Sequence, residues 1–321
     1  MKKLRFLLSL IMPENHYQSL QAACARETAQ RLGVDVEVVF ANNDAIAQSD
    51  QLLNAIQSSK ESRFDGLICA PVGTTLVQVA RHAASAGIGW AILNRECEYS
   101  DELRRKFQVP VFSVCPDQDE IGRIQGNQIK ALLPEGGLIL YILGPTVSTI
   151  SELRSRAMNA VKPASVQVRT LIGNFSEQSG YNAVSKWLQL STSTTTPVRL
   201  VAGQNDDMAM GARKAFEALT NGPDRFRWLS LPYIGVDCCP EAGQKWVQSG
   251  LLKASVVNPP TAGVALEMMV RSLRGGGPTP ERTLIRPNSY PSIDQLRPAA
   301  PANPPDGLEL DKRHGEVQTM K

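Results

Sequence analysis

The sequence predicts an α/β protein with two similar lobes, each a parallel sheet flanked by helices. Three observations support this prediction. The length of 321 residues is sufficient for two domains. Short apolar runs alternate with helical stretches, which is the pattern of βαβ units and parallel sheets. Finally, a second series of strands and helices, similar in size to the first, begins after Asp117.

The first series contains five apolar runs that predict strands, at residues 4–12, 34–40, 66–69, 89–93 and 109–114. Helical stretches lie between them, at residues 17–32, 45–58 and 76–86. Gly33 and Gly87 stand just after two of these helices, where a chain often adopts the left-handed conformation that glycine accepts. The order of elements therefore fits one α/β lobe.

The second series starts with a helix at residues 120–133 and continues in the same alternation. Its predicted strands are residues 138–143, 166–172, 199–203, 233–236, 253–257 and 282–286. Its other predicted helices are residues 151–161, 181–190, 208–219, 241–249 and 262–273. From Ala299 onward the chain is rich in proline, alanine and charge, so we expect residues 299–321 to form an extended or disordered tail.

The N-terminal segment MKKLRFLLSLIM has a basic start and a short apolar run, as a signal peptide does. No A-x-A-like cleavage site follows it; residues 13–16 are Pro-Glu-Asn-His, and a helix comes next. We therefore interpret residues 4–12 as the first strand of the mature fold. This interpretation leaves the chain without a convincing signal peptide, and predicts a cytoplasmic protein if the sequence is complete.

Composition excludes several classes of protein. The net charge of +3 and the absence of a long Lys/Arg cluster argue against a nucleic-acid surface. No segment approaches the roughly 18 apolar residues needed to span a membrane. Six cysteines without CxxC spacing and only three histidines argue against a zinc site, and the cysteines weakly favour a reducing compartment.

One strand–helix junction is especially informative. Residues 199–203 are apolar, and the polar segment Gln204-Asn205-Asp206-Asp207 follows at once. A helix then begins near Met208. In open parallel sheets, ligands bind outside the carboxyl ends of the strands, so this segment is a candidate binding loop. The alternative is that Asn205 or Asp206 only caps the helix N-terminus.

The same arrangement recurs after other predicted strands. The residues at these positions include amides, carboxylates, arginines and aromatic rings, at 13–17, 70–72, 94–95, 148–154, 174–175, 204–206, 237 and 258. Planar polar groups can bond vicinal hydroxyls, and aromatic faces can pack on ring C–H groups. A phosphate site would instead require a glycine-rich turn, and neither GxGxxG nor a P-loop occurs. The mixture favours a sugar as ligand.

At this point the chain resembles a known family, the type I periplasmic sugar-binding proteins for ribose, galactose and allose, which are related to the effector domain of LacI-type repressors. The resemblance covers roughly residues 3–298. It is strongest at residues 13–20 (PENHYQSL), 65–71 (DGLICAP), 91–95 (AILNR), 204–211 (QNDDMAMG) and 234–237 (IGVD).

The resemblance implies two Rossmann-like lobes joined by a three-strand hinge, with the sugar between them and closure about the hinge. It places residues 1–116 and 259–287 in the N-terminal lobe. Residues 117–258 and 288–298 then form the C-terminal lobe.

The resemblance also implies ligand-binding roles for ten residues. Arginines at 95 and 154 match residues that bond hydroxyls or the ring oxygen, and amides or acids at 205, 237 and 258 match far-lobe and hinge positions. Three residues depart from the family pattern: Glu14 replaces an amide, His16 an aromatic ring and Asn94 an acid, so the identity of the sugar stays open. The predicted set is Glu14, His16, Tyr17, Asn94, Arg95, Arg154, Phe175, Asn205, Asp237 and Asn258.

Structural roles are the alternatives for several of these residues. Tyr17 could simply cover the first helix, and Phe175 could belong to the core. Arg154 could pair with Glu152 or another acid on a solvated face. Asp237 is harder to explain by a structural role, because it directly follows a buried strand.

The resemblance implies a non-catalytic solute-binding protein for ABC-type uptake or chemosensing, periplasmic and monomeric, with no metal or cofactor. Its expected partners are a small sugar and an ABC permease or a histidine kinase. The alternative is an intracellular ligand-sensing regulator or kinase partner without its own DNA-binding domain, because only three residues precede the first strand. An enzyme is disfavoured, since no GxSxG or HExxH occurs and Cys238 beside Asp237 is the only thiol that raises the question.

Overall fold

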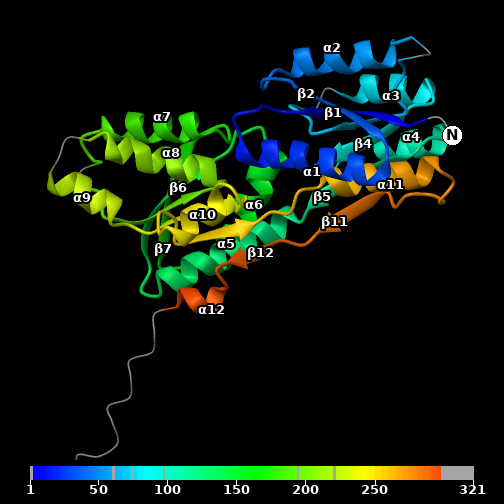
Figure 1. Cartoon of the computed structure of the whole chain (residues 1–321). Helices are drawn as coiled ribbons and strands as arrows, with labels where there is room; N and C mark the ends of the chain where they lie inside the picture. Colours follow the sequence, from blue (N-terminus) through cyan, green and yellow to red (C-terminus); the bar gives the residue numbers. More distant parts are fainter. Residues whose placement is uncertain are drawn as a thin grey trace, which may run out of the picture.

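Two six-stranded sheets form the centres of two lobes that lie side by side (Figure 1). The computed structural model describes residues 3–59, 62–73, 76–96, 98–193, 195–219 and 222–297. The tail predicted at residues 299–321 lies outside this part of the chain. Each sheet is mainly parallel and has helices on both faces, which confirms the predicted fold class.

The first sheet combines five consecutive strands with one strand from near the end of the chain, and all its neighbours pair in parallel. Parallel sheets buried on both faces are formed by nearly continuous apolar runs, as these strands are. In spatial order the strands are β11 (Arg282–Ile285), β5 (Val111–Pro116), β4 (Gly89–Leu93), β3 (Gly66–Cys69), β1 (Arg5–Leu10) and β2 (Asp35–Phe40).

Successive residues of β1 face opposite sides of the first sheet. Phe6, Leu8 and Leu10 pack beneath α1 (His16–Leu32) and α11 (Ala262–Leu273). Leu7 instead joins the core on the other face. The helices on that face are α2 (Ala45–Ile56), α3 (Val77–Ser85) and α4 (Ser100–Lys106).

The second sheet repeats the strand order of the first, except that its last strand pairs antiparallel with β10. In spatial order the strands are β12 (Asn288–Tyr290), β10 (Ala254–Val257), β9 (Tyr233–Asp237), β8 (Val198–Gly203), β6 (Gly137–Leu143) and β7 (Val166–Ile172). The helices on one face are α7 (Glu177–Leu188), α8 (Asp206–Glu217), α9 (Pro223–Leu229) and α10 (Gly243–Gln248). The helices on the other face are α5 (Gln118–Leu132), α6 (Thr149–Val161) and α12 (Ile293–Leu296).

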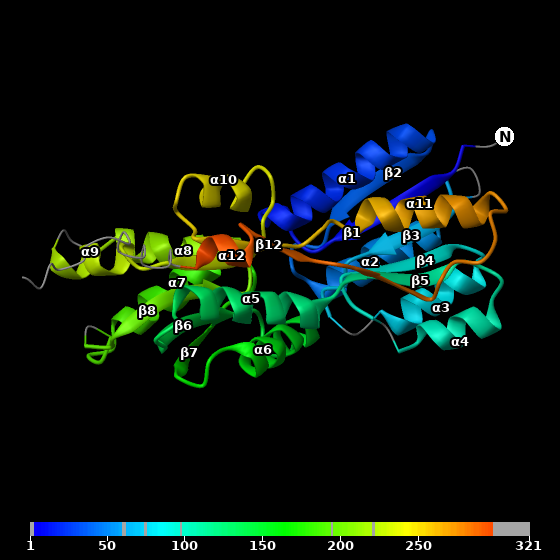
Figure 2. The ribbon, with the colours of Figure 1, turned by 90° about the horizontal axis from the view of Figure 1, so that it is seen from below.

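The chain passes between the lobes at three places (Figure 2). It leaves the first sheet after β5 to begin α5, returns after β10 to begin α11, and crosses again between β11 and β12. The strand membership of the two sheets is compatible with the predicted lobe boundaries, which stay a prediction.

Most predicted elements are present, including β1 where a signal peptide was the alternative. Four short elements were not predicted: α4, α9, β12 and α12. Within the described residues, no helix is both long and apolar enough to cross a bilayer.

Candidate functional site

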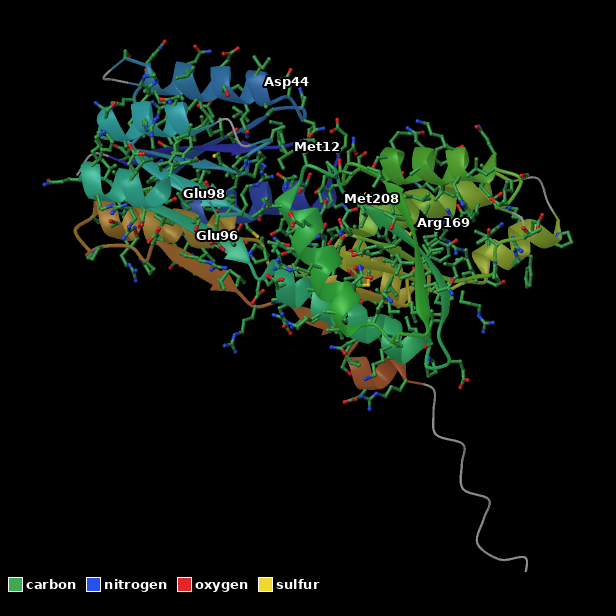
Figure 3. All side chains as sticks on the ribbon, turned by 180° about the vertical axis from the view of Figure 1, so that it is seen from behind. Met12, Asp44, Glu96, Glu98, Arg169 and Met208 are labelled. Atoms are coloured by element: carbon green, nitrogen blue, oxygen red, sulfur yellow. The ribbon has the colours of Figure 1, made fainter. Side chains whose placement is uncertain are left out.

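A cavity of about 230 Å³ lies between the two lobes, at the carboxyl ends of their strands. Each of the ten strands β1 to β10 ends in a residue that lines the cavity or is followed by one within a few residues. Met12, just beyond β1, lies at the end of the first lobe that faces the second (Figure 3). The volume is below the roughly 300–1,000 Å³ of pockets for drug-sized ligands, so the cavity suits a small molecule.

Eight of the ten predicted residues line this cavity. The first lobe and the connections between lobes contribute four of them, and the second lobe contributes the other four: Tyr17, Asn94, Arg95 and Asn258, then Arg154, Phe175, Asn205 and Asp237. They are far apart in the sequence, and the strand ends bring them together. Convergence on one cavity is the geometric condition that a binding site requires.

Glu14 and His16 do not line the cavity, although both were predicted to contact the ligand. Glu14 is exposed. The His16 ring instead meets the edge of Trp246, with 5.4 Å between ring centroids, and its Nδ1 lies 2.5 Å from Asp207 Oδ1. His16 therefore connects the two lobes beside the cavity.

Several lining residues were missed by the sequence analysis. The amides among them lie close to strand ends or at the start of α1, namely Asn15, Gln18, Asn43, Gln118 and Asn174. The strand-end rule could have identified Asn43 after β2 and Gln118 after β5. Asn15 lies between two predicted residues of the segment 13–20, and the sequence pattern does not distinguish it from them.

Asn94 directly follows β4, with a left-handed φ of 68° that asparagine adopts more readily than most residues. Its side-chain Oδ1 accepts hydrogen bonds from Tyr17 Oη (3.3 Å), Gln21 Nε2 (3.2 Å) and Thr261 Oγ1 (3.3 Å). Tyr17 Oη also lies 3.1 Å from the carbonyl oxygen of Pro259, so its single hydrogen is shared between these two acceptors. Hydrogen bonds thus connect Tyr17 and Asn94 of the first lobe to the segment that leads from β10 into α11.

Arg154 is buried on α6 and forms no ion pair within the described residues. Its Nε donates to Gln118 Oε1 at 2.8 Å, and its Nη1 donates to the carbonyl of Gln204 at 2.6 Å. The alternative that it pairs with Glu152 on a solvated face is therefore wrong. Burial lowers the pKa of this guanidinium, although nearby Asp237 favours its charged form.

Asp237 ends β9 with a φ of 106°, a conformation that non-glycine residues rarely adopt. Its Oδ1 accepts a hydrogen bond from Asn258 Nδ2 at 2.9 Å. Burial raises the pKa of Asp237 to about 7, even though Arg154 and Asn258 favour its ionised form. A strained, buried carboxyl group at a strand end is typical of a functional site.

Asn205 has both of the roles considered for it: it caps the N-terminus of α8, and it lines the cavity. Its Oδ1 accepts from Met208 N at 3.0 Å, while its Nδ2 donates to the carbonyl of Phe175 at 2.8 Å. Asn15 repeats this arrangement at α1: Oδ1 accepts from Gln18 N, and Nδ2 donates to the same Phe175 carbonyl at 2.8 Å. Phe175 packs on the core of the second lobe and lines the cavity, so both interpretations of this residue apply.

Asp206 is a structural residue behind the site. Its carboxylate accepts from Ser255 Oγ at 2.7 Å and from Cys238 N at 2.6 Å. A Cβ at Gly235 or Gly243 would lie about 2 Å from its oxygens, as ideal placement gives 2.1 and 2.0 Å. Burial raises the pKa of Asp206 well above its ordinary value. Asp206 thus connects three elements that position Asp237.

The start of α1 is docked on the second lobe. His16 N donates to Asp207 Oδ2 at 3.1 Å, in addition to the contact of its ring with the same carboxylate. Tyr17 packs with Cys239 and Ala242 in one apolar cluster. Together with the Asn15–Phe175 bond, these contacts close the lobes on each other at one side of the cavity.

The arrangement supports binding better than covalent chemistry. Burial raises the pKa of the Cys238 thiol to about 12, and that of Cys239 is also raised, so neither is an activated nucleophile. Among the described residues, no three His, Cys, Asp or Glu side chains are grouped as metal ligands. What the cavity offers is a set of fixed hydrogen-bonding groups.

A fold of two α/β lobes with a lined cavity between them defines a two-lobe ligand-binding protein. A family model described as the periplasmic binding protein domain matches residues 7–277, and the chain belongs to this family. No curated protein matches the sequence.

Solved structures share this fold at low identity. The binding component of an arabinose ABC transporter from Shewanella sp. ANA-3, bound to L-arabinofuranose, is 21% identical with a TM-score of 0.76; the match covers 91% of this chain and 93% of that one. A Mycobacterium smegmatis protein in complex with β-D-fucofuranose is 20% identical, with a TM-score of 0.75 and coverages of 91% and 92%. An ABC transporter solute-binding protein from Bacillus halodurans C-125 with bound myo-inositol is 21% identical, with a TM-score of 0.73 and coverages of 92% and 96%.

Proposed function

We propose that this protein is a non-catalytic solute-binding protein that closes its two lobes around a small polyhydroxylated ligand of monosaccharide size. The observation that carries the proposal is the cavity between the lobes, lined from the ends of ten strands. Fixed amides, a guanidinium and a carboxyl group are suited to bond vicinal hydroxyls. The three structural neighbours named above were solved with small polyhydroxylated molecules, which supports the same ligand class.

The proposal includes a partner and a compartment. Two of the three named neighbours are components of ABC transporters, so we assign this chain to uptake through an ABC permease rather than to regulation. The family is named for the periplasm, and we place the protein there as a monomer. The lobe boundaries at residues 116/117, 258/259 and 287/288 are the proposed hinge.

The ligand-binding residues proposed from the structure are the eight predicted residues that line the cavity, together with Asn15 and Gln118. Calorimetric titration against a panel of pentoses, hexoses and polyols should find a ligand with micromolar or tighter affinity. Asp237→Ala and Asn205→Ala should each weaken its binding by about 1–3 kcal/mol, because each leaves buried polar partners unpaired.

Asp224→Ala is a suitable control, because Asp224 is an exposed acid on α9, away from the lining of the cavity. It should leave the affinity unchanged. Failure of every polyhydroxylated compound to bind the folded wild-type protein would refute the proposed function.

A further inference from the structure

The charges that line the cavity do not balance. Among the described residues, its ionisable side chains with charge at neutral pH are Arg95, Arg154 and Asp237, which are two cations and one acid. Because burial raises the pKa of Asp237 to about 7, this acid is only partly ionised at neutral pH. The cavity therefore carries an excess positive charge.

The buried cation is Arg154, whose hydrogen-bond partners are both neutral. They are a glutamine side-chain oxygen and a backbone carbonyl, reached through Nε and Nη1. Its Nη2 donates to no group in the described part of the chain and is not enclosed, since it is absent from the buried atoms that lack partners. A buried charge whose hydrogen-bond partners are all neutral is costly, so an anionic ligand group bonded to Nη2 would relieve that cost.

The asparagines of the cavity present N–H donors to it. Backbone N–H groups of Thr261 and Ala262 donate to Gln21 Oε1, at 2.9 and 2.8 Å, which fixes Gln21 Nε2 as the donor to Asn94. Because Gln21 Nε2 donates, the Asn94 atom that faces it must be the acceptor Oδ1. The other polar atom of the Asn94 amide, the donor Nδ2, is then the one available to the cavity. Helix N-caps fix Asn15 and Asn205 in the same way: the side-chain oxygen accepts from the backbone, and Nδ2 donates one N–H to the carbonyl of Phe175 and keeps the other.

Acceptors are fewer than donors. Asp237 has one carboxyl oxygen bonded by Asn258 and a second one without a partner in the described residues. Asn258 Oδ1 has no hydrogen-bond partner among the described residues, but it is enclosed and therefore offers the cavity no acceptor. A neutral hexose brings five hydroxyl donors, each of which needs an acceptor when buried, whereas a carboxylate brings only acceptor oxygens.

Arg154 and Asn94 belong to one hydrogen-bonded chain. Gln118 accepts from Arg154 through Oε1 and donates through Nε2 to the carbonyl of Asn94, at 2.8 and 3.2 Å. The donors are thus connected across the two lobes, and the acceptor Asp237 is held separately, by a hydrogen bond from Asn258 Nδ2. This division suits a ligand with a carboxylate at one end and hydroxyl groups at the other.

We propose that the ligand is a sugar acid, a small polyhydroxylated monocarboxylate, with its carboxylate against Arg154 Nη2 and Asn94 Nδ2 and its hydroxyl groups toward the carboxyl group of Asp237. This inference rests on the proposed function and narrows its ligand class.

The test is calorimetric titration at pH 7 with matched pairs that differ in charge: D-galactose with D-galacturonate, D-glucose with D-glucuronate, and D-gluconate with D-glucitol. In at least one pair the acid should bind ten times more tightly than its neutral parent. Raising the salt concentration should reduce this preference only slightly, because the charges are buried.

Asn94→Asp tests the placement of the carboxylate. It replaces the Nδ2 donor by an anionic oxygen, so affinity for the preferred acid should fall by tenfold or more. Asn42→Asp is the matched control, because it adds the same charge at an exposed position just after β2 that does not line the cavity. It should leave the affinity unchanged. Circular dichroism of each variant establishes that it is folded.

The outcomes separate the two proposals. If compounds of the panel bind but in every pair the neutral parent binds at least as tightly as its acid, the sugar-acid inference is overturned while the proposed function stands. If Asn94→Asp folds and keeps full affinity for the acid, the inference is also overturned. If neither acids nor neutral compounds bind the wild-type protein, the proposed function itself fails.

Discussion

The two walls of the cavity differ in how their polar groups are used. On the first-lobe wall, Asn94 Oδ1 is bonded by three donors that come from α1 and the start of α11, and Tyr17 Oη is bonded to a carbonyl. On the second-lobe wall, Arg154 and Asp237 are buried, ionisable and only partly bonded. The first wall is largely satisfied by the protein, and the second is not.

This difference indicates separate roles for the two walls. Groups that are fully bonded within the protein hold shape, while buried groups with unused bonds gain most from a ligand. We therefore expect the second lobe to determine most of the binding energy and the charge of the ligand. The first lobe should determine how the cavity is enclosed.

The largest expected effect comes from Arg154→Met, which keeps an unbranched side chain but removes the guanidinium group and its charge. Ligand affinity should fall by about 1.5–3 kcal/mol, the value of hydrogen bonds to a charged group. Stability should change less, because the lost desolvation cost offsets the loss of bonds to Gln118 and Gln204. Titration calorimetry and thermal unfolding measure the two quantities.

Arg156→Met is the matched control for this variant. Arg156 lies two residues further along α6, is largely exposed and pairs with Asp119 at the surface. Its removal should leave ligand affinity unchanged. Equal losses of affinity in the two variants would mean that net charge, not the buried guanidinium, determines binding.

The next effect separates the two functions of Asn205. Asn205→Ala removes both the cap of α8 and the donor to Phe175, and should lower the free energy of unfolding by about 1 kcal/mol while weakening binding. Asn205→Asp keeps a good capping residue but removes Nδ2. It should retain most of the stability and still lose affinity. Parallel stability and affinity losses in both variants would contradict this separation.

The sequence predicts an element correctly where the element's own residues show a clear apolar run or helical periodicity. The apolar runs that became β3, β4 and β7 have the predicted limits, as does α11. The four missed elements are short and depend on distant partners. In α4 and α9 a single large apolar residue is buried, Leu103 and Trp228, so no periodicity is visible. The strand β12 exists because it pairs with β10.

The sequence predicts which strand ends form the site, but it does not predict which side chains at those ends point into the cavity. Asn15, His16 and Tyr17 are consecutive at the start of α1, where successive side chains are turned by about 100°. This rotation points Tyr17 into the cavity and His16 toward Asp207 and Trp246. The rotational position of α1 is set by its docking on both lobes, which the sequence alone does not reveal.

The smallest expected effect concerns His16, which links the two walls outside the cavity. Its hydrogen bond with Asp207 is the main cause that raises its pKa, and the acids Glu177 and Asp237 also favour the charged form. Trp246 is the remaining group packed against the ring. Opening the lobes would remove these contacts and return the pKa to its ordinary value near 6.5.

The sign of the pH effect follows from this difference. A group whose pKa is higher in the closed form favours closure fully below its ordinary pKa, and the contribution is lost as pH rises through the raised value. Affinity should therefore fall between about pH 6.5 and the raised pKa of His16. Because the His16 ring is half-exposed, the contribution should be at most about 1 kcal/mol.

The measurement is calorimetric titration from pH 5.5 to 8.5 on the wild type, His16→Asn and His82→Asn. Asparagine at position 16 can still donate to Asp207 but does not titrate, so the fall in affinity attributable to His16 should disappear. His82 is exposed on α3, and its variant should follow the wild type. Asp237, whose pKa is about 7, titrates in all three proteins, so the difference in slope between His16→Asn and the wild type measures His16 together with its electrostatic effect on Asp237. If His16→Asn keeps the wild-type slope, the pH dependence belongs to Asp237 and the second wall alone, and the link between the walls is independent of proton binding.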